Sequence, residues 1–221
     1  FIFSKKFMTC EFVPLCHIYQ LMPSLEEVCI KLLGRPGWVP KVLVGGALSF
    51  IPLLNLIPLG YLLEYTIRLK NKGSWDLPDW KFVAPLILFK SGFRFLVLLL
   101  TYTGCPILIG CLVSILLDGL TFGILGIISY FPVAVGAFIG PFLFLAAIHA
   151  YLTDGLLSDA FKINLILDIV KNMGLRLILP VIAFWGIILL ALPLYGFSFF
   201  IGTWILLAYS SALHFSITNK K

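Results

Sequence analysis

Charged side chains are scarce in this sequence. Only 12% of its residues are Asp, Glu, Lys or Arg, whereas 61% are hydrophobic and the mean hydropathy is +1.07. An average soluble domain carries about a quarter charged residues, so this chain has too little polar surface to cover a globule in water. The composition excludes a soluble fold and predicts an all-α, polytopic membrane protein with the lipid bilayer as its solvent.

Catalytic and cofactor motifs are also missing. The sequence has no HExxH zinc motif, no Walker loop and no GxSxG nucleophile elbow. Its five cysteines form no disulfide framework, and the group Cys10, Cys16 and His17 lacks the ligand spacing of a zinc site. We therefore expect no enzyme activity, no cofactor and no metal centre.

Positive charge is confined to a few segments. All sixteen Lys and Arg residues fall in residues 5–6, 31–41, 68–94, 162–176 and 220–221. Membrane proteins concentrate Lys and Arg on the cytoplasmic side, so the net charge of +6 requires no nucleic-acid partner. The pattern predicts a chain in the cytoplasmic (inner) membrane with its C-terminus in the cytoplasm.

Long uncharged runs predict about four full spans, at roughly 20 residues each. The predicted spans are residues 95–117, 132–153, 177–194 and 197–216. We expect the first span to bend near Pro106, where a backbone donor is missing. Residues 24–221 then form a single integral membrane domain. Residues 1–23 lack the order of a signal peptide and remain unassigned.

Two charged segments predict amphipathic helices on the membrane surface. In residues 24–33 the apolar side chains recur on one stripe, and Ser24 and Glu27 have the spacing of a capping box. This segment is too short to cross a bilayer. Residues 154–176 mix aspartates and basic residues with apolar ones, and we expect a second surface helix there.

Residues 42–67 contain an apolar run with a broken middle. Pro52 and Pro58 each remove a backbone donor, and Asn55 places an amide at membrane depth. Such a backbone is tolerated where it is buried in protein or lines a wet cavity. Basic residues flank both ends of the run, which favours both ends on the same side. We expect a re-entrant hairpin of two half-length helices, with one kinked span as the alternative.

Several positions in and around this run form a specific pattern. They are Trp38, Lys41, Gly45, Gly46, Ile51, Pro52, Asn55, Gly60, Tyr61, Gly73, Leu77, Pro78, Trp80 and Gly92. With them, residues 24–95 resemble a bacterial and archaeal membrane family called domain of unknown function 4013, and residues 96–217 are compatible with it in hydropathy and loop placement. The resemblance implies a multi-pass membrane protein, such as one of the bacterial inner membrane, and carries over no cofactor or catalytic residue. We interpret the pattern, together with Pro58, as a structural motif.

Two histidines are the candidate cofactor ligands. His149 and His214 each lie about one turn from the cytoplasmic end of a predicted span, so they can share a depth. Imidazole at such a place can ligate haem or a chlorophyll magnesium. It can equally make hydrogen bonds at the membrane interface, and we expect this second role.

Two function classes remain. The scarcity of buried charge favours a non-catalytic structural or accessory subunit of a homo-oligomeric or heteromeric membrane assembly, with lipid and protein partners. The pairs Gly119/Gly123 and Gly136/Gly140 have the spacing that permits close helix packing. The broken hairpin favours the alternative, a transporter or channel for an unidentified solute, because discontinuous helices commonly build transport sites.

Overall fold

The computed structural model describes residues 23–80 and 85–218, and these ranges contain helices and no strands. In chain order the elements are α2 (Leu25–Leu33), α3 (Trp38–Leu48), α4 (Leu56–Lys72), α5 (Pro85–Leu99), the π-helix η2 (Leu100–Gly104), α6 (Cys105–Leu120), η3 (Gly126–Tyr130), α7 (Phe131–Asp154), η4 (Asp159–Phe161), α8 (Ile163–Leu190), η5 (Leu192–Leu194) and α9 (Tyr195–Thr218). The all-α class is confirmed. The unassigned segment 1–23, with its cysteine group, lies outside the described residues except for its last position.

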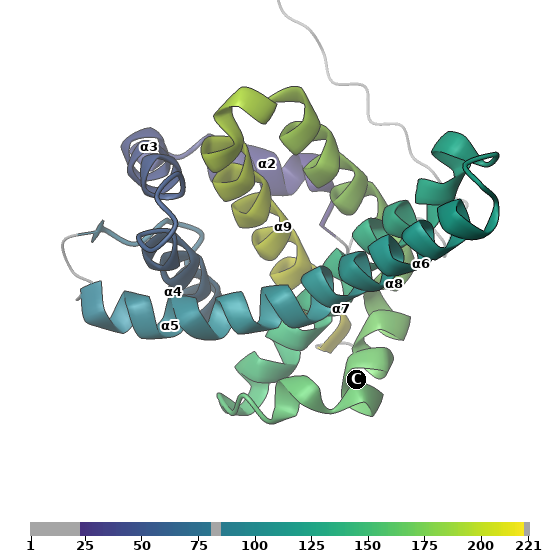
Figure 1. Cartoon of the computed structure of the whole chain (residues 1–221). Helices are drawn as coiled ribbons and strands as arrows, with labels where there is room; N and C mark the ends of the chain where they lie inside the picture. The colour runs from purple at the N-terminus through teal and green to yellow at the C-terminus, as the bar shows by residue number, and fades with distance from the viewer. Residues whose placement is uncertain (1–22, 81–84, 219–221) are drawn as a thin grey trace, which may run out of the picture.

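Four helical stretches of the described chain are long and apolar enough to cross a bilayer. They are Pro85–Leu120, Gly126–Asp154, Ile163–Leu190 and Leu192–Ile217. They follow the order of the four predicted spans, so the chain is a multi-pass helical bundle. Figure 1 shows α5, η2 and α6 joined end to end in one long helix, with α8 and α9 connected by a short turn.

The first span is longer than the sequence predicts. Its predicted start was residue 95, but α5 begins at Pro85 because apolar residues continue on both sides of Lys90 and Arg94. At a rise of about 1.5 Å per residue, 36 residues extend roughly 54 Å, whereas a bilayer core is roughly 30 Å thick. Lys90 and Arg94 both lie in the N-terminal part of this long helix. There the Arg94 guanidinium donates to the Tyr151 hydroxyl at 2.9 Å.

Near Pro106, where the sequence predicts a bend, the structure has the π-helical segment η2 directly before α6. Pro106 stands in the first turn of α6, directly after η2, so a carbonyl of η2 receives no hydrogen bond from it. A π turn is wider than an α turn, and here it relieves the contact between the proline ring and the carbonyl one turn earlier. The break in the span is therefore local, and the helix continues through it.

The predicted boundary at residue 177 is absent. The surface helix expected at 154–176 and the span expected at 177–194 are one continuous helix, α8, which starts at Ile163 and ends at Leu190. In its first half Ile166 is buried and Asp168 is exposed, as expected of an amphipathic segment. The charges alone do not end a helix, and this half contains no proline to interrupt it.

Glycines allow α6 and α7 to pack backbone to backbone. An added Cβ at Gly110 would lie 2.6 Å from the Pro132 carbonyl oxygen, and one at Gly136 would lie 2.5 Å from the Pro106 carbonyl oxygen. Gly140 meets the Thr103 backbone at 2.8 Å in the same way. The pair Gly136/Gly140 therefore lies in a close helix contact, as its spacing predicts.

The other glycine pair has no such role within the described chain. Positions Gly119 and Gly123 have nothing within 4 Å of an added Cβ, and Gly123 has a φ of +77°. They belong to the end of α6 and the turn after it. Gly123 suits this turn because glycine accepts a left-handed backbone at no steric cost.

The predicted break between residues 42 and 67 separates α3 from α4. Pro52 and Asn55 lie in the non-helical stretch, and Pro58 lies in the first turn of α4. Each helix packs mainly on a different neighbour. An added Cβ at Gly45 would meet the ring of Phe200 on α9 at 2.5 Å, and one at Gly60 would meet the Leu88 carbonyl oxygen on α5 at 1.9 Å.

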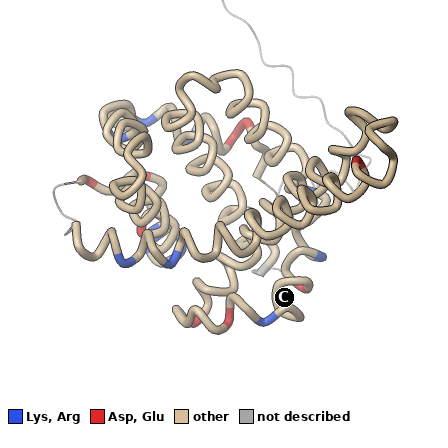
Figure 2. The backbone as a smooth tube through the Cα atoms, in the orientation of Figure 1, with Lys and Arg blue, Asp and Glu red and all other residues tan. Residues whose placement is uncertain are grey.

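Lys and Arg avoid two of the turns between the spans. Figure 2 shows no basic residue on the α6–α7 turn (121–130) or on the α8–α9 turn (191–194). The α7–α8 connection carries Lys162, and α4 ends with Lys70 and Lys72. Because successive spans alternate in direction, the two uncharged turns lie on one side of the bundle and the α7–α8 connection on the other.

Candidate functional site

The segment 75–80, called here the clamp loop, folds over α3 and α4. The Lys41 ammonium on α3 donates to the Leu77 carbonyl oxygen at 2.6 Å and pairs with the Asp79 carboxylate at 2.7 Å. In return, the indole N–H of Trp80 donates to the Lys41 carbonyl oxygen at 3.2 Å. The clamp loop therefore binds both the side chain and the backbone of Lys41.

Tyr61 makes the matching connection from α4. Its hydroxyl donates to the Pro78 carbonyl oxygen at 2.5 Å, and its ring stacks on the indole of Trp80 with centroids 3.9 Å apart. On the other side, the indole of Trp38 lies 6.3 Å from that of Trp204 on α9. Lys41 and Tyr61 therefore join α3 and α4 to the clamp loop, and Trp38 joins α3 to α9.

Asn55 is the polar residue of the pattern that was expected at membrane depth. Its Oδ1 atom is buried and finds no hydrogen-bond partner within the described part of the chain. An unsatisfied buried amide oxygen costs about 1–3 kcal/mol. The interpretation of the Pro52–Pro58 break as a structural device stays a prediction.

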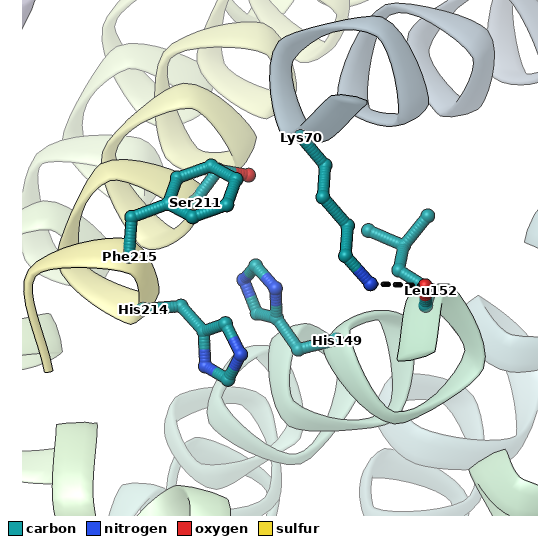
Figure 3. Close-up of a pocket in the computed structure, with 6 residues that line it drawn as sticks. All are labelled: Lys70, His149, Leu152, Ser211, His214 and Phe215. Carbon is teal, nitrogen blue, oxygen red and sulfur yellow. Dashed lines mark hydrogen bonds between the residues drawn. The ribbon is translucent and has the colours of Figure 1, made fainter. Parts of the chain in front are cut away.

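The two candidate histidines lie face to face at one end of the bundle (Figure 3). The rings of His149 on α7 and His214 on α9 have centroids 4.8 Å apart and planes inclined by 15°. His149 is buried, and its Nε2 lies 3.2 Å from the Ser210 hydroxyl oxygen. The Ser210 hydroxyl also lies within hydrogen-bond distance of the Leu207 carbonyl oxygen, at 3.0 Å.

A lysine from a third helix completes this group. The ammonium of Lys70, near the end of α4, donates to the Leu152 carbonyl oxygen in the last turn of α7. Carbonyls in a last turn lack partners within their own helix and favour a positive charge. Partial burial lowers the pKa of Lys70, and the carboxylate of Asp154 opposes that shift. Sequence reasoning missed Lys70 because it lies far from both histidines along the chain.

The space beside the histidines is small. Lys70, His149, His214 and Ser211 line a cavity of about 10 Å³, enough for at most one water. The Ser211 hydroxyl oxygen is buried and without a hydrogen-bond partner among the described residues, so a water there would have a polar partner. Two imidazoles that bind one haem approach it from opposite faces, whereas these two rings stack on each other. Within residues 23–80 and 85–218 no group of three or more His, Cys, Asp or Glu side chains could hold a metal ion.

A larger cavity lies between the spans and was not foreseen from the sequence. Its volume is about 300 Å³, and its wall comes from α5, η2, α6, α7, α8 and α9. Aromatic and aliphatic side chains such as Phe144, Trp185 and Leu206 form most of it, and only carbon atoms face the space. Trp185 is fixed in this wall because its indole N–H donates to the Ala137 carbonyl oxygen at 3.0 Å.

No known family, curated protein or solved structure matches this chain. The resemblance of residues 24–95 to the family called domain of unknown function 4013 therefore stays a prediction.

Proposed function

We propose that this protein is a non-catalytic integral membrane protein that serves as a structural or accessory subunit of a membrane assembly. The observation that carries the proposal is the uneven burial of the four spans. Only 11% of the apolar window in Pro85–Leu120 and 22% of that in Ile163–Leu190 are buried inside the chain, against 50% and 56% in the other two. Two spans thus offer most of their surface to lipid or to a partner.

The uncovered face of α6 is continuous. Its large apolar side chains recur at helical spacing and are more than half exposed; they are Leu108, Ile109, Leu112, Ile115 and Leu116. Positions spaced in this way lie on one face of a helix. A second copy of the chain or another membrane protein can pack along such a face without unfolding any element. Lipid chains cover it in the absence of a partner.

The orientation in the membrane is part of the same proposal. The α3–α4 segment enters the membrane as a re-entrant hairpin, and the C-terminus lies in the cytoplasm. Two observations support this. Helix α3 has 11 residues, about 16 Å, which is too short to cross a bilayer core. The turns without Lys or Arg, 121–130 and 191–194, lie on the side away from the α7–α8 connection, as expected of outer turns.

The clamp loop supports membership in the family called domain of unknown function 4013. The pattern that suggests the resemblance is a set of positions scattered over 38–92, and several of them contact one another through the clamp loop. Residues that stabilise a fold by contacting one another are expected in other proteins that have the same fold.

Transport of a solute is the second candidate, because a proline-broken helix pair commonly builds a transport site. The cavity between the spans argues against a polar solute, since only carbon atoms face it. The subunit proposal is therefore preferred.

One experiment separates the two candidates. The protein is extracted in a mild detergent and its mass is measured by native mass spectrometry, with solute flux into proteoliposomes measured in parallel. A stable oligomer or a heteromeric complex of defined stoichiometry supports the subunit proposal. A monomer that drives solute flux contradicts it and supports a transporter.

A further inference from the structure

The cavity between the spans lies at the depth of the hydrocarbon. It is bounded by Phe144 and Pro141 near the middle of α7 and by Leu206 near the middle of α9. The histidine group lies closer to the helix ends, because His214 is about 12 Å further along α9 than Leu206. The cavity is therefore separate from the polar site of Figure 3.

The wall of this cavity runs from the interior to the surface of the bundle. Phe144 and Thr203 are each only 3% exposed, whereas Leu100 on the π-helix η2 is 56% exposed. A chain end can thus enter from the surrounding lipid near Leu100. Membrane-protein interiors are packed almost without voids, and an apolar space of about 300 Å³ is far larger than the gaps that packing leaves. The wall exposes no polar surface to the space, although the hydroxyls of Thr103 and Thr203 in the wall have no partner among the described residues, so the space favours hydrocarbon over water.

The π-helix opens this part of the wall. Segments of π-helix inside α-helices occur frequently at functional sites, and here Gly104 ends the segment and lines the cavity. An added Cβ at Gly104 would touch only the Leu100 side chain, at 3.6 Å. On the opposite side, Gly140 of α7 holds the Thr103 backbone close, so the opening is fixed by packing.

We infer that this cavity is a binding site for one acyl chain of a membrane phospholipid. Hydrocarbon is the chemistry that an all-carbon wall recognises, since any polar group placed there would lose its hydrogen bonds. A phospholipid supplies such a chain at the depth of the cavity while its headgroup stays at the interface. The site goes beyond the proposed function, because it does not depend on a protein partner.

The test uses the full chain in phosphatidylcholine vesicles that contain a small share of phosphatidylcholine with a diazirine on one acyl chain. After irradiation, peptide mass spectrometry compares labelling of the buried segment 203–206 with labelling of Leu190, which is 90% exposed. The expected result is strong labelling of 203–206 in the wild type. If the wild type is labelled only at Leu190 and other exposed positions, the inference is wrong, and no variant is needed to show it.

Two matched glycine variants test the cavity itself. Gly104→Leu fills the space and is expected to lower the ratio of labelling at 203–206 to labelling at Leu190 by about tenfold, as a loss of 1.4 kcal/mol in binding free energy would. The control Gly186→Leu changes a glycine of α8 that has nothing within 4 Å of an added Cβ and does not line the cavity. It should leave the ratio unchanged.

Circular dichroism and size-exclusion chromatography check the fold of both variants. If Gly104→Leu does not fold, Ile188→Phe, which enlarges another side chain of the wall, takes its place. An unchanged ratio in a folded cavity-filling variant overturns the inference. Displacement of the label by equimolar free oleate also overturns it, because it assigns the site to a fatty acid. Neither outcome bears on the oligomeric state that tests the proposed function.

Discussion

The ring of Tyr61 lies almost flat on the indole of Trp80, with an interplanar angle of 12°, and the hydroxyl of the same tyrosine bonds the Pro78 carbonyl oxygen. One fully buried side chain on α4 therefore holds the clamp loop by two kinds of contact. The loop in turn holds Lys41 on α3. The relative position of two helices that pack mainly on other neighbours depends on this connection.

Removing the tyrosine hydroxyl tests the clamp. Tyr61→Phe keeps the stacked ring but leaves the Pro78 carbonyl oxygen without its donor, so we expect the free energy of unfolding to fall by about 1–2 kcal/mol. Thermal and denaturant unfolding in detergent measure this. Tyr130→Phe, at a position 64% exposed, is the control and should be neutral. Equal stability of the two variants would show that the clamp contact contributes nothing.

A methyl group at the α4–α5 contact should be poorly tolerated. In Gly60→Ala the new Cβ would lie 1.9 Å from a backbone carbonyl oxygen that cannot rotate away, so we expect a loss of at least about 3 kcal/mol. The yield of monodisperse protein and its melting temperature report the loss. Gly119→Ala, where a Cβ meets nothing, should instead be neutral or gain up to about 1 kcal/mol from helix propensity. A stable Gly60→Ala protein would contradict the described helix contact.

Replacing the buried amide should not harm the fold. Asn55→Leu removes an oxygen that has no partner among the described residues, so the free energy of unfolding should stay the same or rise by up to about 2 kcal/mol. Asn71→Leu changes an exposed amide and should bring no such gain. If Asn55→Leu is stable but loses its partner proteins or any solute flux, the Pro52–Pro58 break has a functional role and its interpretation as a structural device is wrong.

The orientation can be measured with single cysteines in a cysteine-free background. Ser74→Cys and Lys220→Cys are expected to react with a membrane-impermeant maleimide only from the cytoplasmic side. Ile124→Cys, in the turn after α6, should react only from outside. Reaction of Ser74→Cys from outside would mean that residues 42–67 cross the membrane as a kinked span.

Protein purified in mild detergent without added cofactor should show no Soret band and no red chlorin band. The stacking of His149 on His214 and the cavity of about 10 Å³ beside them leave no room for a macrocycle between the rings. An absorbance spectrum at known protein concentration is sufficient. A near-stoichiometric band that disappears in His149→Ala or His214→Ala would contradict the arrangement of Figure 3.

Local chemistry made parts of the fold predictable. The capping box is present as the spacing of Ser24 and Glu27 predicts, with the Glu27 N–H donating to the Ser24 hydroxyl at 3.1 Å. The break near Pro52 and the π-helical segment before Pro106 lie where a proline removes a backbone donor. The length of α8 was not predictable from the same rules, because a run of charges on one face is compatible both with a surface helix and with the wet end of a span.

The candidate site was predictable only in part. The common depth of His149 and His214 follows from counting residues along two spans, and the structure does bring them together. The position of Lys70 beside the histidines, and the existence of the apolar cavity, depend on how far apart the helices lie and how each is rotated about its own axis. Hydropathy carries no information about that rotation. The π-helical segment at 100–104 contributes Leu100, Thr103 and Gly104 to the wall of the cavity.

The clamp loop also affects the order in which contacts form while the chain is being synthesised. Its contacts with Lys41 and Arg35 join positions 39 and 41 apart, so these partners have left the ribosome while the later spans are still being synthesised. Contacts between residues near in sequence form early because little chain entropy opposes them. The clamp can therefore close before α9 exists. When α9 arrives, the ring of Phe200 finds Gly45 already in place on α3 as its binding surface.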